Sequence, residues 1–338
     1  MSDSHLDHGA YTVGWMVTIG VELDAGRLLL DKEHADLPAR PHDPNSYILG
    51  EMGIHNVVIV FPPQGRSGIV SATHIVTNMI RTFQKIRFVL LVGVGGGAPG
   101  APNASNSYMD IRLGDVIVCC PDGNDGGIVH HDRGKFTDDG FLPMSHVSKP
   151  PGWLLAKVQK LRSDHNLGRG LMNDYILGLQ QHISQVETLA IYQFPGRGRD
   201  KLFKSDSPHI GGEDCSLCDQ IALVHRRDRD KPSVHHGLIA SGSQVMRSAQ
   251  RRDELRAQRN ILCFETEAVG LMDDFPCLVI RGISDYADSH KDDLWQGYAA
   301  VTSAAYAKDL LRMVDRGDVE ATPTVDTVTK ICKMLVYA

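Results

Sequence analysis

The sequence predicts an α/β fold whose β-sheet is covered by helices on both faces. Short apolar segments alternate along the chain with longer segments that carry a helical pattern, which is typical of this fold class. The apolar segments show little alternation with polar residues, as expected for strands that are buried on both sides. The 338 residues are 42% hydrophobic and 22% charged, an ordinary globular composition that can form a sizeable core.

Seven short apolar segments are the predicted strands. In chain order they are residues 13–19, 55–61, 88–94, 115–119, 237–240, 261–264 and 277–283. Six longer segments are predicted helices, because their apolar residues recur at spacings of three and four with charged residues on the opposite side. In chain order they are residues 23–31, 67–84, 153–165, 244–258, 266–273 and 293–314. We find no internal repeat.

The chain is expected to form its main domain over residues 11–314. Residues 1–10 are polar and slightly acidic and are expected to be disordered, whereas residues 315–338 lose the helical periodicity and are expected to be a tail or linker. Residues 196–231 carry many basic side chains among glycines, acids and prolines, which indicates a long basic insertion loop. Such a loop either covers a site or is a solvated insertion.

Charge and cysteine content restrict the classes of function. Lys and Arg total 35 against 41 Asp and Glu, and the net charge of −6 gives no general attraction to nucleic acid or to an anionic membrane. The first residues do not resemble an export signal, and no apolar segment approaches the roughly 20 residues of a membrane helix. Seven scattered cysteines favour a reducing compartment. We therefore expect a cytoplasmic protein with no nucleic acid partner and no membrane partner.

Glycines follow the third predicted strand. Residues 93–98 read Gly-Val-Gly-Gly-Gly-Ala and match the letters of a dinucleotide-binding fingerprint, but Pro99 and Pro102 prevent the helix that this motif requires. We predict a sharp turn at the strand end, where a ligand can approach the backbone closely because three adjacent residues lack a Cβ atom. A glycine turn without a ligand is the alternative.

Charged and polar side chains gather near the ends of three other predicted strands: Glu22, Glu265, Glu267, Arg281, Ser284 and Asp285. Open α/β sheets bind ligands in a crevice at the carboxyl ends of their strands. For each residue alone, helix capping or a helix-start acid is the alternative explanation. Taken together with the glycines, they predict a sugar-sized cleft that contains a pair of carboxyl groups.

Two further groups have weaker signals. Cys215-x-x-Cys218, with His209 nearby, is part of a zinc-binding pattern. A structural zinc site needs four ligands, and only this cysteine pair has clear spacing, so we predict no metal. His130 and His131 are either catalytic or part of a polar loop.

A family resemblance is carried by segments that keep their order and spacing: residues 11–15, 55–59, 92–97, 110–115, 237–242 and 281–291. These segments resemble the purine nucleoside phosphorylase and nucleosidase superfamily, which includes methylthioadenosine/S-adenosylhomocysteine nucleosidase. They look most like the nucleoside-phosphorylase-like domain found in fungi, alone or at the amino end of NOD-like receptor proteins. Over residues 11–314, the resemblance implies a three-layer αβα sandwich with a central mixed β-sheet. It also implies a homo-oligomer, no cofactor and a small-molecule purine nucleoside as substrate.

The resemblance assigns catalytic roles to three residues. Asp285 matches the acid that protonates or hydrogen-bonds the purine N7, Glu22 matches the glutamate that activates water, and Arg281 matches an arginine near that water. Glu267 matches the carboxylate that binds the ribose hydroxyls. Further residues are expected around the sugar and the base: Glu265, Thr266, Ser284, Gly93, Val94, Gly95, Gly96, Val245 and Met246. Thr266 replaces the usual methionine beneath the ribose, and Val245 stands where the bacterial nucleosidase has an aromatic residue.

The choice between hydrolysis and phosphorolysis rests on two positions. Phosphorolytic relatives carry a Gly-Asp-Pro-x-Arg loop near the amino end and an arginine two residues before the glycines, because a phosphate dianion needs paired guanidinium groups. Here the first position reads Thr-Ile-Gly-Val-Glu over residues 18–22, and the second is Leu91. We therefore predict a purine nucleosidase in which water is the nucleophile. A phosphate-dependent nucleoside phosphorylase and a non-catalytic nucleoside-sensing module of an immune-type receptor are the alternatives.

Overall fold

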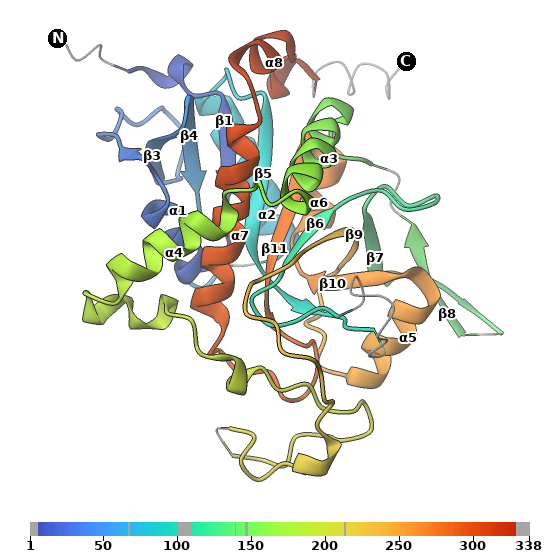
Figure 1. Ribbon diagram of the computed structural model, residues 1–338. Helices are drawn as coiled ribbons and strands as arrows, with labels where there is room; N and C mark the ends of the chain where they lie inside the picture. The colour runs from blue at the N-terminus through green and yellow to red at the C-terminus, as the bar shows by residue number, and fades with distance from the viewer. Residues whose placement is uncertain are drawn as a thin grey trace.

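The computed structural model describes residues 6–66, 68–100, 110–138, 140–145, 148–212 and 214–328. A mixed β-sheet runs through its centre, with helices packed against both faces (Figure 1). The predicted α/β class and the three-layer αβα sandwich are both confirmed.

The described strands, in chain order, are β1 (Val13–Met16), β2 (Lys32–Glu33), β3 (Tyr47–Met52), β4 (His55–Val60), β5 (Phe88–Gly97), β6 (Val116–Cys119), β7 (Ile128–Thr137), β8 (Gly140–Ser145), β9 (Val234–Ser241), β10 (Ile261–Glu265) and β11 (Cys277–Asp285). Their spatial order is β2-β3-β4-β1-β5-β11-β6-β9-β7-β8, and β10 pairs with both β5 and β9. Strands β1, β5 and β11 are parallel neighbours, so their carboxyl ends meet at one edge of the sheet. Strand β10 runs antiparallel to β5 and enters this region from the opposite direction.

One helical layer contains α1 (Gly20–Leu28), α3 (Gly152–Asn166), α4 (Met172–Ile183) and α7 (Gln296–Arg312). Helix α7 contacts the other three helices as well as strands β5, β6 and β11. The second layer contains α2 (Ile69–Thr82) and α6 (Ala268–Asp274), which pack on each other, while α5 (Ala249–Arg259) contacts β10. Among the described helices, none combines the length and the apolar character that a bilayer crossing requires.

Helix α7 lies directly on β11, the strand that carries two of the predicted catalytic residues. Its first turns are rich in alanine and are buried. A Cβ atom added to Gly282 of β11 would lie 1.9 Å from the carbonyl oxygen of Ala299 in α7. Only glycine lets the helix backbone come this close, and the contact fixes the position of the strand between Arg281 and Asp285.

Every predicted strand and helix is present, with ends that differ by a few residues. Strand β3, the β7–β8 hairpin and helix α4 were not predicted. The predicted glycine turn is wrong, because β5 continues through Gly97 and pairs with β11 along the glycines. Glycine is required at these positions because neighbouring side chains occupy the space that a Cβ atom would take.

The chain ends also differ from expectation. The predicted disorder of residues 1–10 is wrong for residues 8–10, which form a short 3-10 helix, while residues 1–5 lie outside the described part. The predicted tail is wrong for its first half, because helix α8 (Arg316–Ala321) follows the domain. Val325 is fully buried and its N–H donates to the carbonyl of Ile86 at 2.8 Å. Residues 329–338 are not described.

Candidate active site

Arg281 is the centre of a buried cluster of carboxylates. Its side chain is inaccessible to solvent, and Nη2 lies 2.5 Å from Glu265 Oε2 and 3.3 Å from Glu267 Oε2. Its Nη1 lies 4.0 Å from Glu22 Oε1. One guanidinium thus contacts carboxylates from α1, from β10 and from the start of α6. The carboxylates of Glu265, Glu267 and Glu22 in turn raise the pKa of Arg281, although burial alone would lower it.

Glu22 is held in a fixed orientation by backbone donors. Its Oε2 accepts hydrogen bonds from the Thr18 N–H at 2.6 Å, the Thr18 hydroxyl at 3.0 Å and the Ile19 N–H at 3.2 Å. Its Oε1 accepts from the Val94 N–H at 2.7 Å, which joins the start of α1 to β5. The carboxylate therefore has the predicted place at a helix start, where it satisfies N–H groups, and it also faces Arg281.

Glu265 and Glu267 have different surroundings. The Glu265 carboxylate accepts from the N–H groups of Glu267 and Ala268 at 3.0–3.1 Å, so it satisfies the first turn of α6 as well as Arg281. Glu267 accepts from the Thr266 hydroxyl and contacts Arg281 more loosely. Burial, with the nearby Glu265 carboxylate adding to it, raises the pKa of Glu267 to about 7. Glu267 can thus change protonation near neutral pH.

Asp285 ends β11 and lies further along the same edge. Its Oδ2 accepts from the Ser284 hydroxyl at 2.8 Å and from Lys291 Nζ at 2.7 Å, and its Oδ1 accepts from the Ala287 N–H at 2.9 Å. The pairing with β5 shifts between Ile283 and Asp285, as in a β-bulge. Bulges redirect side chains at functional sites, and this one sets where Asp285 projects.

The glycines of β5 lie between these groups, in close contact with their side chains. A Cβ atom on Gly93 would lie 2.2 Å from Glu22 Oε1 and 2.5 Å from Arg281 Nη1, and one on Gly96 would lie 2.8 Å from Asp285 Oδ1. A Cβ on Gly95 would lie 2.5 Å from the sulfur of Cys263. From Gly93 to Gly96 a strand rises about 10 Å, at roughly 3.3 Å per residue.

Two cavities are lined by residues predicted for the site. The first, of about 230 Å³, is lined by Ser284 and Asp285 together with Arg199 and Lys201 of the basic insertion. The second, of about 710 Å³, is lined by Val245 and Met246. The Val245 side chain is 62% exposed. The described residues therefore bring the carboxylates and Asp285 to one edge but leave Val245 facing outward.

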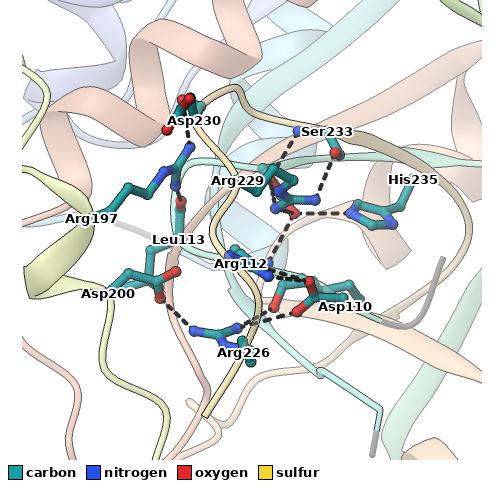
Figure 2. A network of polar contacts seen from close by, with 12 residues as sticks. Asp110, Arg112, Leu113, Arg197, Asp200, Arg226, Arg229, Asp230, Ser233 and His235 are labelled. Carbon is teal, nitrogen blue, oxygen red and sulfur yellow. Dashed lines mark hydrogen bonds and ion pairs between the residues drawn. The ribbon is translucent and has the colours of Figure 1, made fainter. Parts of the chain in front are cut away.

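The basic insertion is attached to the domain by buried polar contacts (Figure 2). Arg229 donates to both oxygens of Asp115 at 2.6 Å, and His235 lies 2.9 Å from the same carboxylate. Burial alone would raise the pKa of Asp115, but the hydrogen bond with His235 and the charge of Arg229 hold it below its usual value. Because Arg229 is bound to Asp115 of the domain, the insertion is docked, and its Arg199 and Lys201 line the first cavity.

Arg226 ties the insertion to the end of β11. Its Nη2 donates to Asp200 Oδ1 at 2.8 Å and to the hydroxyl of Tyr286 at 2.7 Å, and Tyr286 is the residue after Asp285. This contact and the one from Lys291 to Asp285 were not predicted. The only sequence signal for Lys291 was its place at the end of the segment 281–291. The Arg226–Tyr286 contact gives no sequence signal, because 60 residues separate the two positions.

Comparison with known proteins gives a consistent assignment. No protein-family model matches the chain. A nucleotide-binding leucine-rich repeat (NLR)-like protein of Hyaloscypha variabilis is 40% identical over 305 residues, which are 90% of this chain and 29% of that protein. The chain thus spans less than a third of that relative. The ATP nucleosidase Cap17 of Escherichia coli is 35% identical over 85 residues, 23% of this chain and 17% of Cap17.

Solved structures share the fold at low identity. Futalosine hydrolase of Helicobacter pylori superposes with a TM-score of 0.55 and 19% identity, covering 91% of this chain and all of that chain. The 5′-methylthioadenosine/S-adenosylhomocysteine nucleosidase of the same organism gives 0.55 and 19%, covering 90% and 100% of the two chains. That of Neisseria meningitidis gives 0.54 and 17%, covering 90% and 99%. Together, the sequence relatives and the shared fold support a place for this chain in the nucleoside phosphorylase and nucleosidase superfamily.

Proposed function

We propose that this protein hydrolyses the N-glycosidic bond of a purine nucleoside and releases the free base and ribose. The observation that carries the proposal is the arrangement along β5, with Glu22, Glu267 and Arg281 near Gly93 and with Asp285 at Gly96. Cleavage of an N-glycosidic bond passes through an oxocarbenium-like sugar, which needs an acid at the base and a nucleophile and an anion at the sugar. The residues around Gly93 and around Gly96 supply these groups.

At the base end, Asp285 in its protonated form donates a proton or a hydrogen bond to N7 of the purine. The bond between C1′ and N9 breaks, and its electron pair goes to the base, which leaves as a neutral purine once a proton has been added. General acid catalysis of this kind accelerates reactions by roughly 100- to 10,000-fold. Ser284 and the Ala287 N–H hold the Asp285 carboxyl in place, and Lys291 supplies a positive charge beside it.

At the sugar end, Glu22 and Arg281 position water. Within the described part of the chain, Arg281 Nη1 and Nε are buried and have no hydrogen-bond partner. A buried donor without a partner is costly, so an oxygen that accepts from Nη1 is favoured at this point. Such a water lies beside the Glu22 carboxylate, which takes its proton as the oxygen adds to C1′. Glu267 accepts hydrogen bonds from the ribose hydroxyls.

Phosphate is disfavoured as the nucleophile at the same place. A phosphate dianion there would face the carboxylates of Glu22, Glu265 and Glu267. Arg281, the guanidinium that contacts them, is already bound to two of these carboxylates. Leu91, which stands where phosphorolytic relatives carry an arginine, is fully buried. These contacts support hydrolysis over phosphorolysis.

The experiment is a panel of adenosine, inosine, guanosine, 5′-methylthioadenosine and ATP, incubated with the protein with and without phosphate and analysed by chromatography. ATP is included because a relative, Cap17, is named an ATP nucleosidase. We expect free base and an unphosphorylated C1 in both buffers. Asp285→Asn and Glu22→Gln are expected to lose at least 100-fold in rate, whereas Glu187→Gln, at an exposed position shortly after α4, is the control.

The outcomes separate the alternatives. Ribose 1-phosphate that forms only with phosphate would establish a phosphorylase. Binding of a nucleoside without release of base, by the wild-type protein and by Glu187→Gln alike, would establish a non-catalytic sensing module. A homo-oligomer and a cytoplasmic location stay predictions, the first of which is measured by analytical ultracentrifugation of the same preparation.

A further inference from the structure

The basic insertion contains a compact group of metal-ligating side chains. The Nδ1 of His209 and the sulfurs of Cys215 and Cys218 all lie within 4.8 Å of one another. His209 Nδ1 is 3.9 Å from the Cys215 sulfur and 3.3 Å from the Cys218 sulfur. In a tetrahedral zinc site, bonds of about 2.3 Å to sulfur and about 2.0 Å to nitrogen place these ligand atoms about 3.5 Å apart. The group therefore has the dimensions of one face of a zinc tetrahedron.

Local hydrogen bonds hold these ligands in place. His209 Nε2 lies 3.4 Å from the carbonyl oxygen of Gly212, and a proton on Nε2 leaves Nδ1 with a free lone pair directed at the cysteines. The Gln220 amide donates to the carbonyls of Cys215 and Cys218 at 3.0 Å and 2.7 Å. These two bonds close the Cys-x-x-Cys segment into a loop. Such outer contacts are typical of built metal sites.

The domain brings one further candidate ligand towards this group, His290, although its ring nitrogens are not among the atoms that lie within 4.8 Å of one another. The His290 side chain is 6% exposed, and neither of its ring nitrogens forms a hydrogen bond with any residue that the structure describes. Its ring centroid lies 5.6 Å from that of His209, close to the roughly 5 Å expected for two imidazoles on one tetrahedral zinc. Phe203 stacks on the ring at 4.1 Å. The Asp288 carboxylate lies 3.7 Å from Nδ1, so Nε2 is the nitrogen left for a metal.

We propose that His209, Cys215, Cys218 and His290 bind one zinc ion that fastens the basic insertion to the end of β11. The sequence predicted no metal because only the cysteine pair had clear spacing, whereas the fold adds a histidine from 81 residues further along the chain than His209. Two sulfurs and two nitrogens in a tetrahedral arrangement favour zinc among the common biological cations.

Proton release accompanies binding. Zinc binds thiolates, and each cysteine therefore gives one proton to solvent as its bond to the metal forms. No change of redox state is involved.

The position of the site gives it a structural role. Cys215 and His290 line the same cavity of about 230 Å³ as Asp285. A zinc ion between the insertion and residue 290 would fix this wall independently of the Arg226 and Arg229 contacts. The proposal does not depend on which reaction the carboxylate cluster performs.

The test uses the full chain, kept reduced, with bound zinc measured by inductively coupled plasma mass spectrometry. Cobalt(II) replaces zinc for absorption spectroscopy. We expect one zinc per chain, and a cobalt complex with a thiolate charge-transfer band and tetrahedral d–d bands. The double variant Cys215→Ser/Cys218→Ser and the single variant His209→Ala should lose both signals. Cys120→Ser, which removes a cysteine elsewhere in the fold, should keep them.

Two further measurements keep the test decisive. His290→Ala should weaken zinc affinity at least tenfold, and an unchanged affinity would overturn the assignment of the fourth ligand. Zinc should slow hydrogen exchange of residues 205–220 in the wild-type protein, a readout that needs no folded variant. If the wild-type protein binds no more cobalt than the double serine variant, or binds it without a thiolate band, the proposal is wrong.

Discussion

Arg281 Nη2 lies 2.5 Å from the carboxylate of Glu265, and the two side chains are 0% and 1% exposed. Glu265 also accepts N–H groups at the start of α6, so this ion pair joins β11 to the helix that presents Glu267. Glu265 therefore positions Glu267, the carboxylate that we propose binds the sugar, and Arg281 connects Glu267 to Glu22. The pair sets the geometry of the site as well as its charge.

Removal of the guanidinium should be strongly destabilising. In Arg281→Met, three carboxylates lose their shared cation in a buried place, and breaking a buried ion pair typically costs about 3–5 kcal/mol. The free energy of unfolding in urea measures this cost. Arg227→Met removes an arginine from an exposed position and is the control. Equal stability of the two variants would show that Arg281 is not needed to compensate the carboxylates.

Glu267 should make stability depend on pH. Burial raises its pKa from 4.5 to about 7, so the folded state holds the proton more tightly than the unfolded state. Its contribution to stability is fully present below pH 4.5 and is lost as the pH rises through about 7. Glu267→Gln cannot ionise, so its stability relative to wild type should increase between pH 5 and pH 8. Urea unfolding at both pH values measures this, and a constant difference would contradict the assigned shift.

Glycine should be required at position 93. The methyl group of Gly93→Ala would overlap Glu22 and Arg281, and forcing such a group into a packed site costs about 1–3 kcal/mol. Base release should fall together with the midpoint of thermal unfolding. Gly178→Ala is the matched control, since no atom lies within 4 Å of its added Cβ and alanine favours a helix by up to about 1 kcal/mol. A fully active, stable Gly93→Ala protein would exclude this close contact.

Arg226 should hold the insertion against the end of β11. In Arg226→Met, Asp200 and Tyr286 lose a charged donor at 2.8 Å and 2.7 Å, so residues 196–231 should detach more often. Limited digestion with chymotrypsin, which cleaves after Phe203 and Leu223, should be several-fold faster than in wild type. Arg227→Met should be digested at the wild-type rate. Equal digestion of both variants would mean that the insertion is held by other contacts.

Regular, buried elements could be predicted from the sequence because their periodicity is local. The β7–β8 hairpin could not, since β7 is exposed over residues 133–137 and has no apolar pattern there. The turn predicted at Gly93 followed from local glycine propensity. The reason for glycine there is the side chains of Glu22 and Arg281, which arrive from segments about 70 and 190 residues away in the sequence.

The candidate site was likewise only partly predictable from the sequence. The strand-end acids and Arg281 were predicted from short motifs, whereas the contacts that orient them depend on the folded chain. Lys291 reaches Asp285 across a turn, and β10 brings Glu265 to Arg281 only because it runs antiparallel to β5. The zinc site we propose depends on His290 in the same way.

The nucleophile can be identified directly. In phosphate buffer made with water enriched in oxygen-18, the protein is incubated with its purine substrate, and the sugar product is analysed by mass spectrometry after a short reaction. Ribose incubated in the same labelled buffer without protein corrects for exchange of the C1 oxygen with water. If Glu22 and Arg281 hold the attacking water, the sugar should carry one oxygen-18 at C1 and no phosphate there. Sugar 1-phosphate with unlabelled C1 oxygen, formed in proportion to the phosphate present, would contradict hydrolysis at this site.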